Sequence, residues 1–255
     1  MSVVLRNFMR NWVLPFLDPR RIFSLALLPR FILEFREYRR RAKREQVKLI
    51  DTYPCLTDRT EHTPFDPHYF YQGAWLARRL RHAAPALHVD AGSSVLMASV
   101  LSAHVPLWFV DYRPLQAELE GLKCIAGSVT ALPFSDASID SLSSLHVIEH
   151  VGLGRYGDPL DPQGSINAAH EFQRVLKPGG RLYLSVPVGR ERVCFNAHRV
   201  FKPISITQYL GDLELLKFSL VDDSGHFVEE ADLDSAAYLD YGCGMFEFTK
   251  SSGNA

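Results

Sequence analysis

Residues 171–189 read EFQRVLKPGGRLYLSVPVG, and this stretch decides the fold class. A helical segment predicted over residues 165–176 runs into Pro178-Gly179-Gly180, where proline and glycine stop a helix. The apolar run at residues 181–187 then predicts a buried strand. A helix, a stop and a buried strand in this order indicate one repeat of an α/β sheet.

The same alternation extends to both sides of this stretch. Further apolar runs predict strands at residues 86–91, 107–112, 122–127 and 139–147, and helices are predicted at residues 73–82 and 95–104. This alternation predicts a doubly wound, mostly parallel sheet with helices on both faces. Residues 213–222 and 243–249 predict a final antiparallel strand pair, so we expect seven strands.

Acidic residues and a glycine mark the ends of the first two strands. The first strand runs into Asp90-Ala91-Gly92, and the second ends at Asp111, 21 positions after Asp90. Ligands of doubly wound sheets bind at the carboxyl ends of the strands. We therefore expect Gly92 to let a ligand approach the backbone closely, Asp90 to accept a hydrogen bond from an ammonium group, and Asp111 to accept from ribose hydroxyls.

Residues 127–150, GSVTALPFSDASIDSLSSLHVIEH, followed by RVLKPGG at 174–180, resemble the core of the class I S-adenosyl-L-methionine-dependent methyltransferases. The resemblance covers about residues 86–189 and implies a Rossmann-like methyltransferase fold, with the last strand inserted antiparallel beside the fifth. It also implies S-adenosylmethionine as cofactor. Ser128 and the Val129 amide would then serve the adenine, and His146 would border the sulfonium.

Two features depart from the family's pattern. Of the usual D-x-G-x-G-x-G loop only Gly92 remains, and Ser128 stands where the family often has aspartate. The segments HVIEHVGLGRYGDPLDPQG (146–164) and FNAHR (195–199) more narrowly resemble an uncharacterised methyltransferase-like group, some of whose members are found with polysaccharide-synthesis genes. A degenerate binding or scaffold protein without turnover therefore stays open as the alternative.

Candidate catalytic residues follow the fourth strand in the segment HVIEH (146–150). A hydroxyl acceptor benefits from a general base, and His150 is the first choice, His198 the second, with Glu149 orienting either. Alternatively, His150 only caps a turn. The segment also spells H-x-x-E-H, a zinc-protease signature. That signature requires a long helix, whereas Gly152 and Gly154 follow here, and no metal site is predicted.

The substrate face is predicted on two polar loops. The candidate substrate residues are Arg155, Tyr156, Asp158, Asn196 and Arg199. Polar loops at the carboxyl ends of strands are well placed to bind a substrate. In the alternative, Arg155 and Asp158 pair with each other to hold the loop. The predicted function is transfer of a methyl group to an oxygen of a sugar, glycan or other small molecule. A nucleotide-sugar or NAD-dependent Rossmann enzyme is a third, weaker hypothesis.

Charge is distributed unevenly along a chain of net charge −1. Residues 1–50 hold 12 Lys or Arg against 4 Asp or Glu, and the remaining residues hold 16 against 25. We expect a basic amphipathic extension at 1–50, a connector at 51–72 and a methyltransferase-like domain at 73–250. The connector either folds over the active site as a lid or packs its aromatic residues on the core. Peripheral contact with a membrane is expected through residues 1–48. The alternative is a helix packed on the domain with its charged face in water.

Composition excludes several other classes. The four cysteines are widely spaced and form no C-x-x-C pair, which argues against a zinc ribbon and a disulfide scaffold. No spanning helix or secretory signal is predicted, and no nucleic-acid partner is expected. The expected location is cytoplasmic, at the inner face of a membrane.

Overall fold

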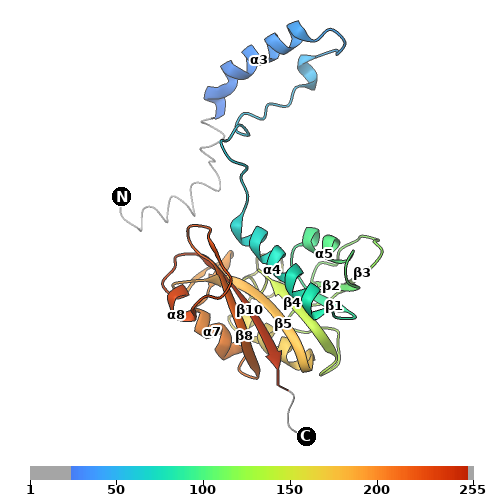
Figure 1. Cartoon of the computed structure of the whole chain (residues 1–255), viewed down its shortest axis with the longest axis vertical. Coiled ribbons are helices and arrows are strands. Elements are labelled where there is room, and N and C mark those ends of the chain that lie inside the picture. Colours follow the sequence, from blue (N-terminus) through green and yellow to red (C-terminus); the bar gives the residue numbers. More distant parts are fainter. Residues whose placement is uncertain (1–23, 252–255) are drawn as a thin grey trace. The chain divides into compact units, whose positions relative to one another are not determined.

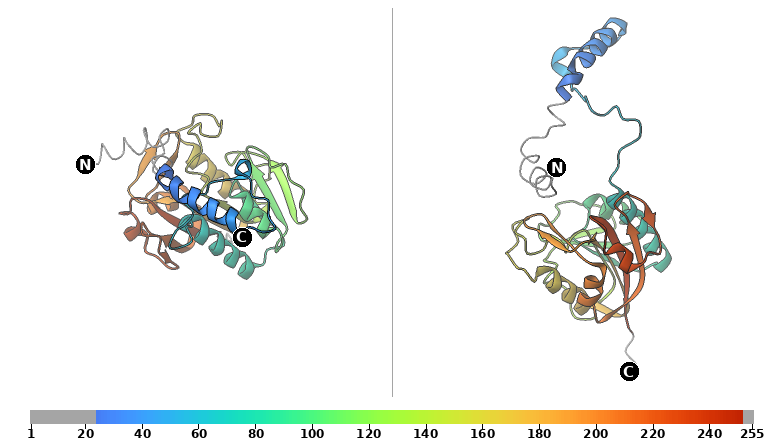
Figure 2. Two further views of the ribbon diagram at one scale, coloured as in Figure 1. Left: turned by 90° about the horizontal axis from the view of Figure 1, so that it is seen from above. Right: turned by 90° about the vertical axis from the view of Figure 1, so that its left-hand side faces the viewer.

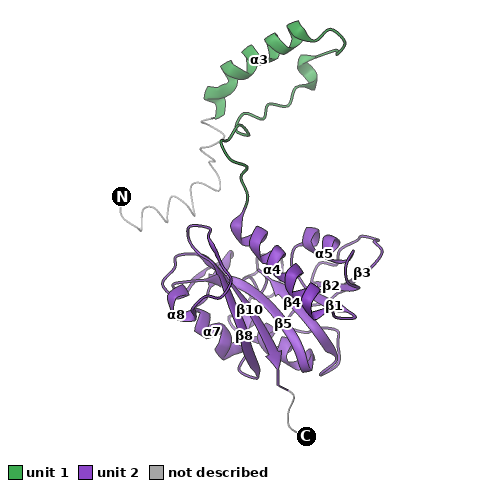
Figure 3. Ribbon diagram, viewed as in Figure 1, with its two compact units in different colours: residues 1–65 green, residues 66–255 purple. Residues whose placement is uncertain are grey.

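The computed structural model describes residues 24–251, which belong to two compact units divided after Phe65 (Figure 3). The second unit is built on an eight-stranded sheet in the order β3-β2-β1-β4-β5-β10-β8-β9 (Figure 1). Its strands are β1 (His88–Ala91), β2 (Leu107–Asp111), β3 (Leu122–Ala126), β4 (Ile139–Leu145), β5 (Leu176–Val188), β8 (Leu213–Val221), β9 (Phe227–Val228) and β10 (Gly242–Lys250).

The first five strands are parallel, and the last strand reverses the direction. β10 pairs antiparallel with β5 on one side and with β8 on the other, which confirms the predicted insertion beside the fifth strand. The two-residue β9 extends the predicted seven strands to eight. A separate hairpin of β6 (Arg192–Cys194) and β7 (His198–Val200) lies outside the main sheet.

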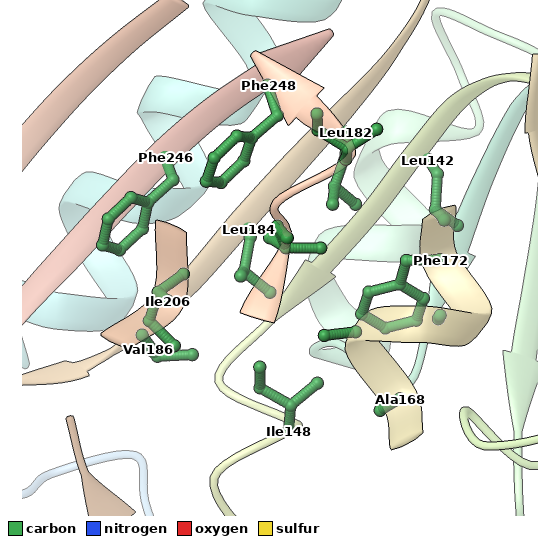
Figure 4. Packing of buried hydrophobic residues seen from close by; sticks show 14 of the residues in the cluster. Leu142, Ile148, Ala168, Phe172, Leu182, Leu184, Val186, Ile206, Phe246 and Phe248 are labelled. Carbon is green, nitrogen blue, oxygen red and sulfur yellow. The ribbon is translucent and has the colours of Figure 1, made fainter. Parts of the chain in front are cut away.

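Helices cover the sheet on both faces, as the alternating pattern predicts (Figure 2). The helices are α4 (Pro67–Ala83), α5 (Val95–Leu101), α6 (Gly164–Val175), α7 (Pro203–Tyr209) and α8 (Leu233–Ala236). Trp75 and Leu76 of α4 pack with Ala98 of α5 in one buried cluster. Phe172 of α6 and Ile206 of α7 belong to the other cluster (Figure 4). The core is therefore divided by the sheet.

The helix α4 begins earlier than the sequence pattern indicates. Asp66 caps it, because its Oδ1 accepts hydrogen bonds from His68 N at 2.9 Å and Tyr69 N at 3.3 Å, and Pro67 occupies the first turn. Residues 67–72, which were assigned to a connector, are thus the first turns of this helix and part of the sheet-containing unit.

The segment RVLKPGG forms the predicted stop between helix and strand. The helix α6 ends at Val175, β5 begins at Leu176, and Gly179 takes the left-handed φ of +76°. Arg174 anchors the end of the helix through ion pairs with Glu171 at 2.6 Å and Asp136 at 2.7 Å. The strand is longer than predicted, because it includes the proline and both glycines.

The first unit contains η2 (Leu25–Leu27), α3 (Leu28–Arg41) and η3 (Leu49–Asp51). Its helix α3 ends at Arg41. No residue between 24 and 65 is buried. Among the residues that the structure describes, no helix is long and apolar enough to span a bilayer. The first 23 residues of the predicted basic extension lie outside the described residues.

Candidate functional site

A cavity of about 540 Å³ lies at the carboxyl ends of β1, β2 and β4. Small-molecule sites commonly have volumes of about 300–1,000 Å³. The cavity is lined by Tyr69, Gly92, Ser93, Ser94, Val95, Asp111, Tyr112, Arg113, Ser128, Val129, Thr130, Leu145, His146, Val147, His150, Val151, Gly152, Tyr156, Asp158, Pro159 and Asp161. A larger, shallow depression lined by residues of 115–124 lies beside β3 and includes none of these strand ends.

Gly92 and Asp111 face the cavity together. Gly92 has a φ of +78°, and a Cβ placed on it would lie 3.1 Å from Val147 Cγ1 and 3.9 Å from Asp111 Oδ2. The other carboxylate oxygen of Asp111 accepts a hydrogen bond from Arg113 N at 2.7 Å. The absent side chain keeps space open beside Oδ2, which is compatible with the predicted placement of a ribose at Asp111. The role of both residues as cofactor ligands stays a prediction.

Asp90 is not part of the cavity lining, which contradicts its predicted contact with the cofactor. Its side chain is fully buried, with Oδ1 accepting from Ser93 N at 3.0 Å and Oδ2 accepting from the Ser143 hydroxyl at 2.5 Å. The reason is register, because Asp90 pairs with Ser143 across β1 and β4. Burial raises the pKa of Asp90 to about 6, while the bonds to Ser143 and Ser93 oppose the rise. Asp90 therefore stabilises the loop of Gly92 from inside the protein through these hydrogen bonds.

Ser93, the residue after Gly92, fixes the shape of this loop. The Ser93 hydroxyl accepts a hydrogen bond from Leu145 N at 2.9 Å, which ties the loop to the end of β4. Ser93 and Ser94 both line the cavity. Because the Ser93 side chain is hydrogen-bonded to the protein, it does not fill the cavity. The loop therefore leaves the cavity open although it contains a single glycine.

Ser128 and Val129, the residues predicted to serve the adenine, follow the end of β3. Ser128 and Val129 line the cavity with Thr130, whose hydroxyl lies 2.8 Å from Ser128 Oγ. The Ser128 hydroxyl also accepts from Thr130 N at 3.2 Å. The structure brings both predicted residues to the cavity that contains Asp111.

Glu149 lies between two histidines in the turn after β4. Its Oε1 is 2.9 Å from His146 Nδ1 and 3.6 Å from His150 Nε2, and its side chain is fully buried. Among the described residues, its Oε2 has no hydrogen-bond partner. Burial opposes protonation of His146, but the acceptors Cys243 and Glu149 raise the pKa of His146 well above its ordinary value. The segment is a turn, so it lacks the long helix of the zinc-protease signature.

His150 has one ring nitrogen held by the protein. Its Nδ1 lies 2.5 Å from the Ala197 carbonyl oxygen. A carbonyl oxygen only accepts, so Nδ1 carries the proton and Nε2 has a free lone pair. Arg155 donates to the same carbonyl at 3.2 Å. His150 also lines the cavity, as its predicted role requires.

The second candidate base, His198, is further removed. Its ring centroid is 6.5 Å from that of His150, and His198 is not among the cavity-lining residues. Burial and the neighbouring His150 lower the pKa of His198. His198 belongs to β7 and stacks at an angle on Tyr241, with 5.0 Å between centroids.

Tyr156 is the residue of the predicted substrate loop that reaches the cavity with its ring held in place. The Arg113 guanidinium lies 4.6 Å and the Arg155 guanidinium 5.0 Å from its centroid. Asp158 also lines the cavity, but its two oxygens accept from Gly152 N at 2.7 Å and Tyr156 N at 3.3 Å. The alternative pairing of Arg155 with Asp158 is not what the structure shows.

Asn196, Arg155 and Arg199 lie outside the cavity lining, contrary to their predicted place in a substrate pocket. Arg199 is buried and donates to Val151 O at 2.6 Å and Ser165 Oγ at 3.1 Å. Burial lowers the pKa of Arg199. Asn196 takes the left-handed φ of +60° and donates to Leu153 O at 3.4 Å. These side chains fasten neighbouring loops, because each finds carbonyl or hydroxyl acceptors before it reaches the cavity.

Tyr69 and Arg113 are two of the cavity-lining residues that were not predicted. Tyr69 comes from the first turn of α4, where the Asp66-Pro67 cap is the signal that places it. Arg113 follows Asp111 by two positions, and its position near a predicted strand end is the only signal for it.

Comparison with known proteins gives one partial family match. Residues 131–238 match the family described as "Caenorhabditis protein of unknown function, DUF268". No curated protein matches the sequence.

Solved structures show the fold. A protein from Galdieria sulphuraria, provisionally assigned as a sarcosine dimethylglycine methyltransferase, has a TM-score of 0.51 at 16% identity and covers 72% of this chain and 86% of its own. The N-methyltransferase NodS from Bradyrhizobium japonicum, in complex with S-adenosyl-L-homocysteine, has a TM-score of 0.50 at 14% identity, covering 85% and 97%. The YcgJ protein from Bacillus subtilis has a TM-score of 0.50 at 14% identity, covering 72% and 100%. The chain therefore has the α/β fold of the class I S-adenosylmethionine-dependent methyltransferases.

Proposed function

We propose that the protein is an S-adenosylmethionine-dependent methyltransferase that methylates an oxygen of a sugar or glycan precursor. One observation carries this proposal, namely that Asp111, Gly92 and His150 line the same cavity. A ribose-binding carboxylate, a close-approach glycine and a base thus share one space. A binding or scaffold protein would not need the base.

Asp111 would hold the ribose, Ser128 and Val129 the adenine, and the loop of Gly92 and Ser93 the amino-acid end of the cofactor. When bound, S-adenosylmethionine supplies an electrophilic methyl group on its sulfonium. The protein's part is then mainly to position the acceptor oxygen in line with that methyl group. The rigid loop, fixed by Ser93 and Asp90 from beneath, suits this task.

His150 would take the proton from the acceptor hydroxyl. Its Nδ1–H is fixed by Ala197 O, so Nε2 is free to accept. Glu149 Oε1, 3.6 Å from Nε2, is placed to favour the positive charge that His150 then acquires. General-base assistance of this kind contributes roughly 10²–10⁴-fold to a rate. Glu149 is a positioning residue, since it does not line the cavity.

The rest of the wall supports a sugar-like acceptor. Tyr156 and Tyr69 contribute aromatic rings, and Asp158 and Asp161 contribute carboxylate oxygens that accept hydrogen bonds within the protein but have further lone pairs for hydroxyl groups. Aromatic faces and carboxylates together suit a ring that is apolar on its faces and polar at its edge. The positively charged side chain of Arg113 lies in the same wall of the cavity.

Calorimetric titration of the full chain with S-adenosylmethionine and, separately, with NAD tests the proposal. Binding of S-adenosylmethionine with 1:1 stoichiometry is expected, followed by label transfer from its methyl group to a panel of sugar acceptors. Binding without transfer to any hydroxyl acceptor would favour the binding module. Binding of NAD alone would replace the proposal with the Rossmann-enzyme alternative.

A further inference from the structure

Beside the cavity, three side chains converge that the proposed function does not use as a set. These are His68 from the first turn of α4, His146 after β4 and Cys243 from the start of β10. One ligand atom of each lies within 4.8 Å of the other two. They come from segments far apart in the sequence, so the fold itself brings them together.

The spacing of these atoms matches the ligand set of a tetrahedral cation. Zinc binds nitrogen at about 2.0–2.1 Å and thiolate at about 2.3 Å, which places such a nitrogen and sulfur roughly 3.5 Å apart. His146 Nε2 and Cys243 Sγ are 3.4 Å apart. His68 offers a ring nitrogen within 4.8 Å of the ligand atoms of His146 and Cys243, so a small side-chain adjustment completes the set.

The outer contacts also have the form of a metal site. His146 Nδ1 donates to Glu149 Oε1 at 2.9 Å, which turns Nε2 toward Cys243 Sγ at 3.4 Å. The His68 ring stacks on Tyr241, with 5.4 Å between centroids. Histidine ligands in metal sites commonly donate their other ring nitrogen to a carboxylate or a backbone carbonyl, as His146 does here.

Charge and chemistry select the class of cation. Two imidazoles and one thiol are ligands for soft or borderline cations and are poor ligands for Mg²⁺ or Ca²⁺. The Cys243 thiolate and the buried Glu149 carboxylate together balance a divalent charge. Among the described residues, Glu149 Oε2 has no partner, so this acid is buried without full compensation from the protein.

We propose that His68, His146 and Cys243 form a binding site for a divalent cation of the zinc class. Binding replaces the one proton between Cys243 Sγ and His146 Nε2, whichever atom carries it, with metal–sulfur and metal–nitrogen bonds, and that proton is released to solvent. Three protein ligands leave one tetrahedral position to a water molecule or another small ligand. The cation ties α4 to β10, and Tyr69, the next residue after His68, lines the cavity. The site therefore fixes one wall of that cavity.

The test uses the full chain freed of metal by a chelator and then titrated with Co²⁺ and Zn²⁺. One equivalent of Co²⁺ should give a thiolate-to-cobalt charge-transfer band and tetrahedral ligand-field bands, and Zn²⁺ should displace it. Cys243→Ser should abolish the charge-transfer band. His68→Gln should weaken binding by more than the roughly 10–100-fold that loss of an outer contact costs.

Cys124→Ser provides the matched control, because Cys124 lies on β3 at the far edge of the sheet. It should bind Co²⁺ as the unchanged protein does. An unaltered spectrum in Cys243→Ser, or the lack of a charge-transfer band in the unchanged protein, would overturn the proposal. Circular dichroism shows whether Cys243→Ser folds. If it does not, the loss of Co²⁺ affinity in His68→Gln tests the proposal, because His68 is only partly buried.

The metal site and the methyltransferase function can fail separately. Asp111→Ala removes the proposed ribose ligand but touches none of the three metal ligands. It should therefore bind Co²⁺ normally whether or not the protein binds S-adenosylmethionine.

Discussion

The His88 imidazole and the Ser143 hydroxyl meet inside the sheet, with 2.9 Å between His88 Nε2 and Ser143 Oγ. Because Ser143 donates its proton to Asp90, its oxygen accepts from His88 Nε2–H. His88 Nδ1 in turn accepts from Ser141 at 2.8 Å. This chain of hydrogen bonds joins β1 to β4 directly beneath the loop of Gly92.

His88 should make the protein sensitive to acid. Burial lowers the pKa of His88 to about 3, whereas the unfolded chain protonates it near its ordinary 6.5. Its contribution to stability is therefore present above pH 6.5 and is lost as the pH falls toward 3. Between pH 7 and 5 this loss is about 2 kcal/mol.

Urea unfolding of the unchanged protein and of His88→Gln at both pH values measures this loss as a difference. Comparison with the variant is needed, because Asp90 has the opposite effect on stability. Its pKa is raised, so its contribution to the free energy of unfolding is lost as the pH rises through about 6. His104→Gln, on the exposed His104, is the control. Equal pH dependence in all three proteins would contradict the prediction.

Gly92→Ala should weaken binding of S-adenosylmethionine at least tenfold, measured by calorimetry. The new methyl group would stand 3.1 Å from Val147 Cγ1 and would enter the space beside Asp111. Gly157→Ala is a matched control, because Gly157 has a φ of +85° with nothing within 4 Å of the added Cβ. Both variants should lose about 1 kcal/mol of stability from backbone strain, but only the first should lose affinity.

Asp111→Ala should weaken S-adenosylmethionine binding by at least tenfold, or about 1.4 kcal/mol. The reason is the loss of the carboxylate that would accept from the ribose hydroxyls. Asp140→Ala controls for the loss of one acidic residue, since Asp140 lies near the start of β4 and pairs with Lys177 at 2.9 Å. An unchanged dissociation constant for Asp111→Ala would remove the ribose from this position.

His150→Gln should lower kcat for methyl transfer by roughly 10²–10⁴-fold while the affinity for S-adenosylmethionine changes little. The variant keeps a polar side chain but cannot accept a proton. His170→Gln, on an exposed residue of α6, should keep full activity. If His198→Gln were the more damaging variant, the role of base would pass to His198.

We propose that α3 and the basic residues after it bind anionic membranes. Leu33 is 65% exposed on this helix, and Arg39, Arg40 and Arg41 form its last turn. Exposed apolar side chains beside basic ones suit a surface of negative lipid headgroups. Triple substitution of these arginines with glutamine should weaken the binding at least tenfold.

Co-sedimentation with phosphatidylglycerol vesicles measures this binding, and phosphatidylcholine vesicles provide the control. Added salt should reduce the pelleted fraction, because the attraction of lipid headgroups for arginine is screened. Equal pelleting of the full chain and of a variant lacking residues 1–48 would refute the proposal.

The sequence by itself determined the architecture and much of the cavity. Apolar runs and helix stops such as Pro178-Gly179-Gly180 act locally, so their pattern predicted the alternating sheet. The carboxyl ends of parallel strands meet at one edge. Gly92 and Asp111 were therefore predicted at one site without knowledge of any long-range contact, and the family resemblance added Ser128.

Only the tertiary structure decided what depends on register and on contacts across the sheet. Asp90 and Asp111 both lie near strand ends, yet pairing with Ser143 buries the first while the second faces the cavity. Cys243 meets His146 from 97 positions away, because β10 inserts beside β5. A side chain's direction and its distant neighbours are set by pairing between strands, and a linear sequence pattern does not contain that pairing.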